Sequence, residues 1–92
     1  MANTKSAKKR MRQAEARRLR HRMRLGIVKA AIRRFEQALH DGNYDEALVR
    51  LRYASGRIDR AAQKGAMHRN KAARQKSHLW RKYNESTKSH AG

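Results

Sequence analysis

The chain has 92 residues with no cysteine and no proline, and its 25 lysines and arginines against seven acidic residues give a formal net charge of +18. This length allows one small domain, and the lack of cysteine excludes a disulfide framework or a thiolate metal site. No apolar run approaches the roughly 18 residues of a membrane span, and no apolar segment follows the basic N-terminus. We therefore expect neither a membrane protein nor a secretory signal.

The positive charge is concentrated at the two ends of the chain. Residues 1–24 carry ten basic and one acidic side chain, residues 25–63 carry seven and five, and residues 64–92 carry eight and one. The three segments therefore contribute +9, +2 and +7. A requirement for solubility alone would spread the charge, so this pattern predicts a polyanionic partner that is contacted at both ends.

A first helix is predicted from about Lys5 to His40, because strong helix formers dominate this segment. Its first half has basic residues on all sides and no apolar stripe. A helix of about 35 residues spans on the order of 50 Å, so this half should project beyond any core. Its second half has an apolar stripe at alternating spacings of 3 and 4, widened by two alanines: Leu25, Val28, Ile32, Phe35 and Leu39, with Ala31 and Ala38.

The second helix is predicted to start after a turn at residues 40–43. Gly42 suits the left-handed position that follows a helix, and Asn43 with Glu46 three residues later resembles an N-cap with a capping-box partner. Gly65 should end this helix. Its predicted inner face consists of Tyr44, Leu48, Leu51, Ser55, Ile58 and Ala62.

The third helix is predicted to begin near Met67 or His68 and to run to about Tyr83. Its predicted inner side consists of Ala72, Ala73, Leu79, Trp80 and Tyr83. The fold class is therefore all-α, a three-helix bundle with a long basic N-terminal helix that projects beyond the core. We expect a single RNA-binding domain over residues 1–83, with a basic arm at 1–24, a bundle core at 25–83 and a flexible tail at 84–92.

No arrangement of residues predicts catalysis, a cofactor or a metal. Asp45 and Glu46 fall in the first turn of a helix, where the helix dipole favours acids, and no second acid is placed to form a catalytic pair. The five histidines include no pair at spacing i, i+4 that would favour zinc. His68 and His78 fit an RNA contact and a local structural role equally well. For Trp80 and Tyr83, packing is favoured over stacking on a base.

Two segments resemble a known family, bacterial small-subunit ribosomal protein number twenty. The first is residues 2–10 (ANTKSAKKR) followed by residues 17–20 (RRLR), and the second is residues 64–77 (KGAMHRNKAARQKS). Residues 32–35 (IRRF) and the turn before residues 45–47 (DEA) are similar too. The chain departs from the family pattern at residues 24–31 and is longer after Tyr83.

The resemblance implies a cytoplasmic structural protein that is not an enzyme and acts as a monomer within the small ribosomal subunit. Such a protein binds small-subunit ribosomal RNA directly, stabilises its fold during assembly and joins the 5′ domain to the long helix near the 3′ end. It implies no cofactor, no small-molecule substrate and no membrane. The RNA contacts that it implies are Lys5, Ser6, Lys8, Lys9, Arg10, Arg12, Arg17, Arg18 and Arg20 in the first helix, and His68, Asn70, Lys71, Arg74, Lys76 and Ser77 in the third.

Three other functions fit part of the pattern. A basic-zipper DNA binder would need an apolar seam of at least three or four heptads, and the seam here covers about two before Gly42. A membrane-active amphipathic helix would need an apolar face in the first half. A general architectural DNA protein lacks specific support, although charge alone does not exclude it.

Overall fold

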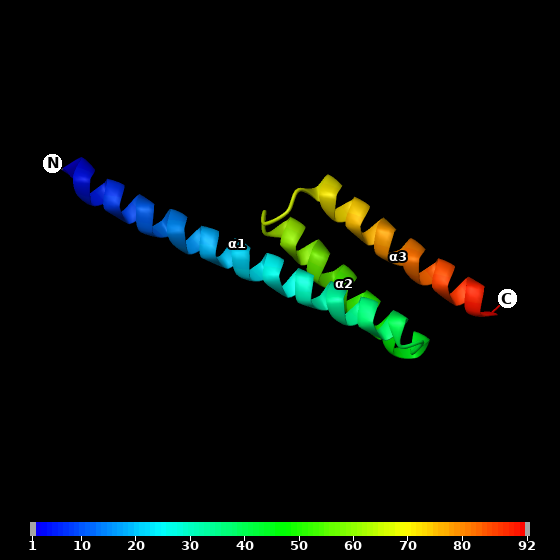
Figure 1. The fold of residues 1–92 in the computed structure, drawn as a ribbon. Coiled ribbons are helices and arrows are strands. Elements are labelled where there is room, and N and C mark those ends of the chain that lie inside the picture. Colours follow the sequence, from blue (N-terminus) through cyan, green and yellow to red (C-terminus); the bar gives the residue numbers. More distant parts are fainter. Residues whose placement is uncertain (1, 92) are drawn as a thin grey trace.

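The computed structural model describes the backbone of residues 2–91 and the side chains of residues 4–89. This part of the chain forms three helices, α1 (Ala2–His40), α2 (Tyr44–Gln63) and α3 (Arg69–Ala91), and contains no strand. α2 runs back along the second half of α1, and α3 then returns in the direction of α1 (Figure 1). The prediction of an all-α bundle with a long N-terminal helix is confirmed.

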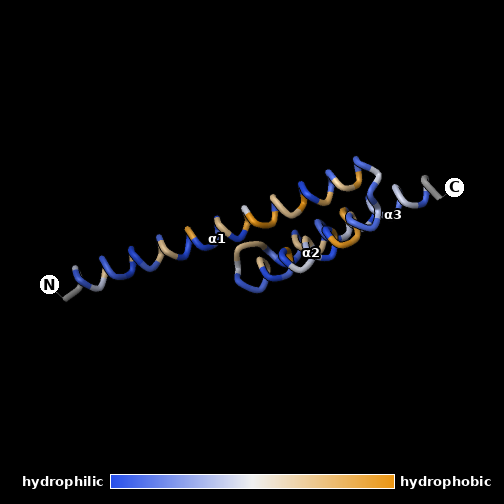
Figure 2. Tube along the Cα trace, turned by 90° about the horizontal axis from the view of Figure 1, so that it is seen from below, coloured by the Kyte–Doolittle hydropathy of each residue, from blue (hydrophilic) through white to orange (hydrophobic). Residues whose placement is uncertain are grey.

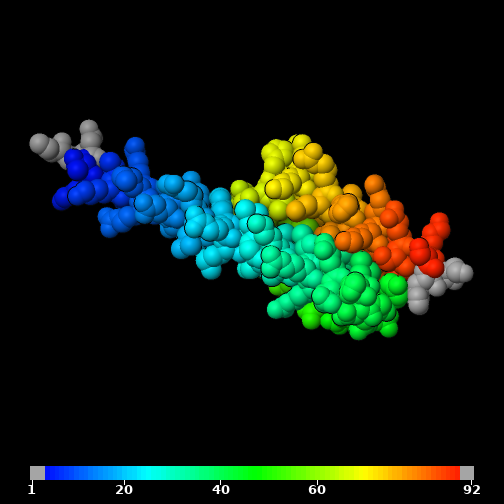
Figure 3. Space-filling model, in the orientation of Figure 1, coloured from blue at the N-terminus to red at the C-terminus, as the bar shows by residue number. Residues whose placement is uncertain are grey.

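The molecule is elongated because only the second half of α1 belongs to the bundle. It spans 72 × 22 × 13 Å along its principal axes, and its radius of gyration is 18.2 Å, against about 12 Å for a compact domain of this length. The first half of α1 extends from the bundle as an isolated rod (Figure 3). We call this segment, residues 2–24, the arm. At about 1.5 Å per residue it adds roughly 35 Å to the length.

The hydrophobic core begins where the arm ends. Half of the buried residues are alanines, so the helices approach one another closely. Figure 2 shows the change along α1 from hydrophilic residues in the arm to hydrophobic ones beside α2. The buried residues are Val28, Ala31, Phe35 and Ala38 of α1, Ala47, Leu51, Ala54, Ile58 and Ala61 of α2, Met67 of the connection, and Ala72 and Leu79 of α3.

α2 is the central helix, and the residues that it buries differ from its predicted inner face. It packs against both α1 and α3, so it needs two adjacent inner stripes. Leu51 and Ile58 are buried as predicted, whereas the other predicted positions are only half-buried. The predicted face omitted three fully packed alanines, Ala47, Ala54 and Ala61. Alanine contributes little to a hydrophobic pattern although it fits the closest helix contacts.

Both inter-helix turns are built on a left-handed glycine. Gly42 has φ 74° and Gly65 has φ 77°, a region that glycine enters without the steric cost of a Cβ. The amide of Asn43 donates to the Ala38 carbonyl at 3.0 Å, which satisfies one of the free carbonyls at the end of α1. The Asn43 side chain accepts from the Glu46 amide at 3.2 Å, so the predicted N-cap of α2 is confirmed.

The predicted end of the third helix is wrong, because α3 continues past Tyr83 to Ala91. The sequence after Tyr83 has no helix breaker before Gly92. The Thr87 hydroxyl donates to the backbone carbonyls of Tyr83 and Asn84, both at 3.1 Å, and so fits within the helix. Residues 84–91 are therefore helical rather than an irregular tail. Met1 and Gly92, the two ends of the predicted division into domain and tail, lie outside the described residues.

Candidate nucleic-acid interface

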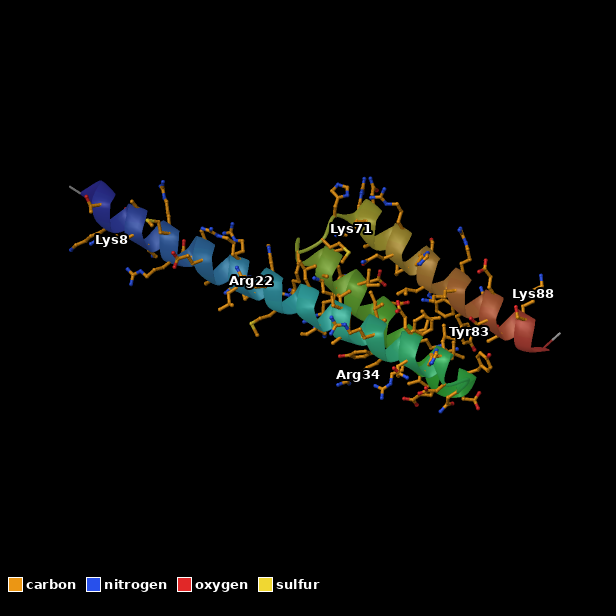
Figure 4. The ribbon with its side chains drawn as sticks, in the orientation of Figure 1. Lys8, Arg22, Arg34, Lys71, Tyr83 and Lys88 are labelled. Carbon is orange, nitrogen blue, oxygen red and sulfur yellow. The ribbon has the colours of Figure 1, made fainter. Side chains whose placement is uncertain are left out.

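The arm presents basic side chains on every side. All nine predicted contacts in the arm, from Lys5 to Arg20, are exposed, and no described side chain of residues 4–24 is buried. Successive residues turn by about 100° around a helix, so the basic residues of the arm face in all directions. Figure 4 shows these side chains extending from both sides of the ribbon around Lys8 and Arg22. The described part of the arm therefore has basic side chains in all directions and no face that packs on the bundle.

A second basic surface follows the outer side of α3. Asn70, Arg74 and Ser77 are exposed at spacings of 4 and 3, which places them on one helix face. Arg81 continues this face four residues later and is exposed as well. Arg74, Ser77 and Arg81 line one shallow surface depression with Ala73 and His78. We call Asn70, Arg74, Ser77 and Arg81 the α3 outer face.

Ala73 lies on this exposed side of α3, which corrects its predicted place on the inner side. Gln75 and Lys76 are half-buried in its place. The inner side of α3 therefore includes two polar residues beside Ala72 and Leu79. A hydrophobic pattern could not identify them, since both combine a long aliphatic stem with a polar end.

His68 caps the start of α3. Its Nδ1 accepts a hydrogen bond of 3.1 Å from the Asn70 amide, and its carbonyl accepts from the Ala72 amide at 3.0 Å. The ring is exposed, so the other nitrogen remains open to solvent. The first turn of α3 contains no acidic residue, whereas the first turn of α2 contains Asp45 and Glu46. The start of α3 therefore keeps the positive end of its dipole available to an anion.

The remaining two predicted contacts on α3 lie on its other sides. The Nζ atom of Lys76 is 2.6 Å from Oδ1 of Asp59 in α2, so this ammonium group holds α3 to α2 and its charge is partly compensated. Lys71 is exposed and lines a groove between α1 and α3 with Ile32 and Glu36. The six predicted residues around α3 therefore do not form a single face.

The two basic surfaces start from the same end of the bundle. In Figures 1 and 2 the connection from α2 to α3 lies beside the point of α1 from which the arm extends. Lys71 marks the beginning of α3 at this end, and Arg22 lies on the adjacent part of the arm (Figure 4). From there the arm and α3 run in opposite directions. The bundle thus fixes the relative orientation of two cationic rods.

Sequence reasoning omitted three exposed or half-exposed arginines that extend these surfaces. Arg22 and Arg24 continue the arm up to the first core residues, and Arg81 continues the α3 outer face. The family motifs did not include these positions. Their helical spacing from predicted contacts was the available signal, since Arg24 follows Arg17 by seven residues and Arg81 follows Arg74 by seven.

The aromatic residues of α3 take part in packing. Trp80 and Tyr83 both pack against the hydrophobic core, and their rings meet edge to face with centroids 6.4 Å apart. The interpretation of both as packing residues is confirmed. The described part of the chain has no exposed set of aromatic rings on which single-stranded bases would stack.

The described residues offer little support for other kinds of site. Among them, no three histidine or acidic side chains come together in a group suited to a metal ion. None of the three helices, over the residues described, combines the length and the apolar character needed to cross a bilayer.

Comparison with known proteins identifies the family. A family model described as Ribosomal protein S20 matches residues 2–84, which include the arm, α2 and most of α3.

The chain belongs to this family. Proteins named small ribosomal subunit protein bS20 are similar to it over nearly their whole length. The one from Thermobifida fusca is 42% identical over 91 residues, covering 99% of both chains. The one from Persephonella marina is 48% identical over 84 residues, covering 91% of both. The one from Clostridioides difficile is 45% identical over 84 residues, covering 91% of this chain and 96% of that protein.

Membership of the S20 family establishes the general function. The chain is a structural constituent of the small ribosomal subunit and not an enzyme, and it works in the cytoplasm as bacterial ribosomes do. The resemblance inferred from the residues alone is confirmed. The matched range also includes residues 24–31.

Proposed function

We propose that the protein binds small-subunit ribosomal RNA directly and stabilises its fold during assembly. The observation that carries this proposal is the arm, in which ten basic residues accompany one acid and no described side chain is buried. Mutual repulsion makes such a helix unfavourable in isolation, and surrounding phosphates would remove the repulsion. The arm is thus suited to enclosure by RNA on several sides.

The protein bridges two RNA elements in this proposal. The arm contacts one element and the α3 outer face contacts the other, while the bundle sets the angle between them. The family resemblance implies that these elements are the 5′ domain and the long helix near the 3′ end. One copy is sufficient for this role, so the protein acts as a monomer within the subunit.

Contacts to phosphate groups supply most of the affinity in this proposal. The residues concerned are the fifteen predicted contacts, extended by Arg22, Arg24 and Arg81, and all but Lys76 and Arg24 are exposed. With roughly eight phosphates neutralised, the logarithm of the binding constant should fall with the logarithm of the salt concentration at a slope of about −7 for a duplex-like target. Recognition then depends on the shape of the folded RNA more than on base identity.

Two experiments test this proposal. Lysate is first fractionated on sucrose gradients at moderate and high salt, and the protein should migrate with the small subunit. Migration with chromosomal DNA would contradict the proposal and favour the architectural DNA alternative. The purified full chain is then mixed with separate transcripts of the 5′ domain and of the 3′ helix, one of them immobilised. Capture of the free transcript should require the protein, and binding to only one transcript would contradict bridging.

A further inference from the structure

A second apolar stripe lies on α1, outside the hydrophobic core. Leu19, Met23 and Ile27 follow one another at intervals of four residues, and their side chains are 55%, 60% and 37% exposed. Gly26 and Ala30 lie on the same face and are exposed too. The core stripe is on another side, since Val28 is about 140° around the helix from Met23. The structure leaves this stripe without a partner inside the described part of the chain.

Gly26 is unexplained by the packing of the protein itself. Glycine is less favourable than alanine in the interior of a helix, yet α1 continues through Gly26 without interruption. A Cβ at this position would meet nothing within 4 Å, so no internal contact requires the missing side chain. A glycine within an exposed stripe allows close approach of an external surface to the helix backbone.

Basic residues border the apolar stripe, and one acid, Glu15, lies four residues before Leu19. Arg12 lies on the same face seven residues before Leu19, and Arg34 lies on it four residues after Ala30. Arg20 and Arg22 border the stripe on its two sides, and all four arginines are exposed. The distance along the helix from Arg12 to Arg34 is about 33 Å. A partner for this face must therefore be able to accept apolar contacts at its centre and carry negative charge along its edges.

A-form RNA has such a surface in its minor groove. This groove is wide and shallow and presents ribose groups and base edges between two lines of phosphates, whereas the major groove is deep and narrow. A second copy of the chain would bring another +18 of charge, and mutual repulsion opposes that association. A protein partner would have to be acidic on all sides of a small apolar ridge. Charge complementarity therefore favours an RNA duplex.

We propose that the stripe formed by Leu19, Met23, Gly26, Ile27 and Ala30 lies against the minor groove of an A-form RNA duplex. The apolar side chains contact ribose groups, Gly26 brings the helix backbone close to the groove, and the bordering arginines reach the phosphates on both edges. This inference rests on the proposed RNA-binding function and specifies one of its contacts. It assigns to the uncharged residues of the stripe a recognition role that does not depend on charge.

The first test removes the apolar contact without changing any charge. The full chain with Leu19→Gln and Met23→Gln is titrated with small-subunit ribosomal RNA at several salt concentrations. Both side chains are exposed, so the bundle should remain folded. We expect affinity to fall about tenfold at every salt concentration, with an unchanged salt slope. Val49→Gln, at a residue that is 61% exposed on α2, is the matched control and should bind as the wild type does.

The second test uses the glycine. Gly26→Ala should raise the melting temperature, because alanine is the better helix former, and should weaken RNA binding severalfold. Gly56→Ala in α2 is the control, since a Cβ there also meets nothing within 4 Å. It should raise the melting temperature and leave the affinity unchanged.

A third test locates the groove directly. The chain has no cysteine, so Ala30→Cys provides a single attachment point for an iron chelate that cleaves nearby RNA sugars. Cleavage sites should appear on both strands of one duplex, displaced between the two strands as a source in the minor groove produces.

Cleavage confined to single-stranded loops would overturn the inference, as would wild-type affinity in the Leu19/Met23 variant or in Gly26→Ala. If these substitutions alter self-association or capture of a protein and leave RNA binding unchanged, the inference is overturned in favour of a protein partner. Absence of RNA binding by the wild type would overturn the proposed function and this inference with it.

Discussion

The indole Nε1–H of Trp80 in α3 donates a hydrogen bond of 3.0 Å to the hydroxyl oxygen of Ser55 in α2. The two residues are 25 positions apart, and both are half-buried. One turn of α3 before Trp80, the ion pair between Lys76 and Asp59 spans the same two helices. α3 is therefore held to the bundle by directed polar contacts in addition to its few buried residues, Ala72 and Leu79.

The Trp80–Ser55 hydrogen bond should contribute measurably to stability. In a double-mutant cycle of Ser55→Ala and Trp80→Phe, we expect a coupling energy of about 1 kcal/mol, typical of a net hydrogen-bond contribution. Urea denaturation followed by circular dichroism gives the four free energies of unfolding. Strictly additive effects of the two substitutions would show that the contact contributes nothing.

The centre of the bundle should be far more sensitive to substitution than its outer surface. Leu51 is fully buried in α2, and Val49 on the same helix is 61% exposed. We expect Leu51→Ala to lower the free energy of unfolding by about 2–5 kcal/mol because it leaves a cavity. Val49→Ala should change it by less than about 0.5 kcal/mol. Similar effects of the two substitutions in urea denaturation would contradict the assignment of the core.

Deletion of residues 2–24 should separate RNA binding from folding. Among the described side chains of α1 the first buried one is Val28, so residues 4–24 contribute no buried side chain to the core. We expect the truncated protein to stay helical by circular dichroism, to bind ribosomal RNA more weakly and to show a flatter salt slope. Loss of helical structure throughout the bundle would show that the arm is needed for folding.

The predicted RNA contacts on α3 should differ in how much each contributes to the salt dependence of binding, because their charges are compensated to different degrees. Arg74 and Arg81 are exposed on the α3 outer face, whereas Lys76 is paired with Asp59. Arg74→Gln and Arg81→Gln should each reduce the magnitude of the salt slope by about 1. Lys76→Gln should change it less, because its charge is already engaged. Equal effects of Arg74→Gln and Lys76→Gln in salt-dependent binding would contradict this distinction.

His68 should act both as a helix cap and as an RNA contact. Because Nδ1 accepts the hydrogen bond from Asn70, the neutral ring carries its proton on Nε2 and can donate it to a phosphate. His68→Asn keeps a capping side chain, but its shorter amide cannot place a donor where Nε2 of the histidine lies, so stability should be retained while RNA affinity falls about fivefold. His68→Ala should also destabilise the bundle by about 1 kcal/mol. Wild-type affinity of His68→Asn would leave His68 with the capping role alone.

Most of the fold could be predicted from the sequence because its signals are local. The stripe from Leu25 to Leu39 follows a helical period, and Gly42 with Asn43 defines a turn by backbone geometry alone. The sequence did not predict that α2 packs against both α1 and α3. Ala47, Ala54 and Ala61 can be recognised as buried contact residues only once the positions of the other two helices are known. The end of α3 was missed because a polar sequence such as 84–89 gives no hydrophobic pattern, although it contains no helix breaker.

The sequence was sufficient to predict which basic residues are exposed in the arm, but not how the predicted contacts are arranged around α3. Counting charges was sufficient to locate the arm, where every predicted residue is exposed. On α3 the family motif identified residues by their position in the chain, and it gave no information on which side of the helix each side chain lies. The inward orientation of Lys76 depends on Asp59, which is 17 residues away in the sequence. Arg81 lies outside the motif and becomes apparent only as part of the α3 outer face.

The alanine-rich core keeps the bundle narrow. Six of the twelve buried residues are alanines, and the molecule measures 22 and 13 Å along its two shorter principal axes. In the proposed complex, these two dimensions set how near one another the RNA elements on either side of the protein can lie. Larger core residues would widen the bundle and increase that separation. Under this proposal, the small core is a condition on the spacing of the RNA as well as on the stability of the protein.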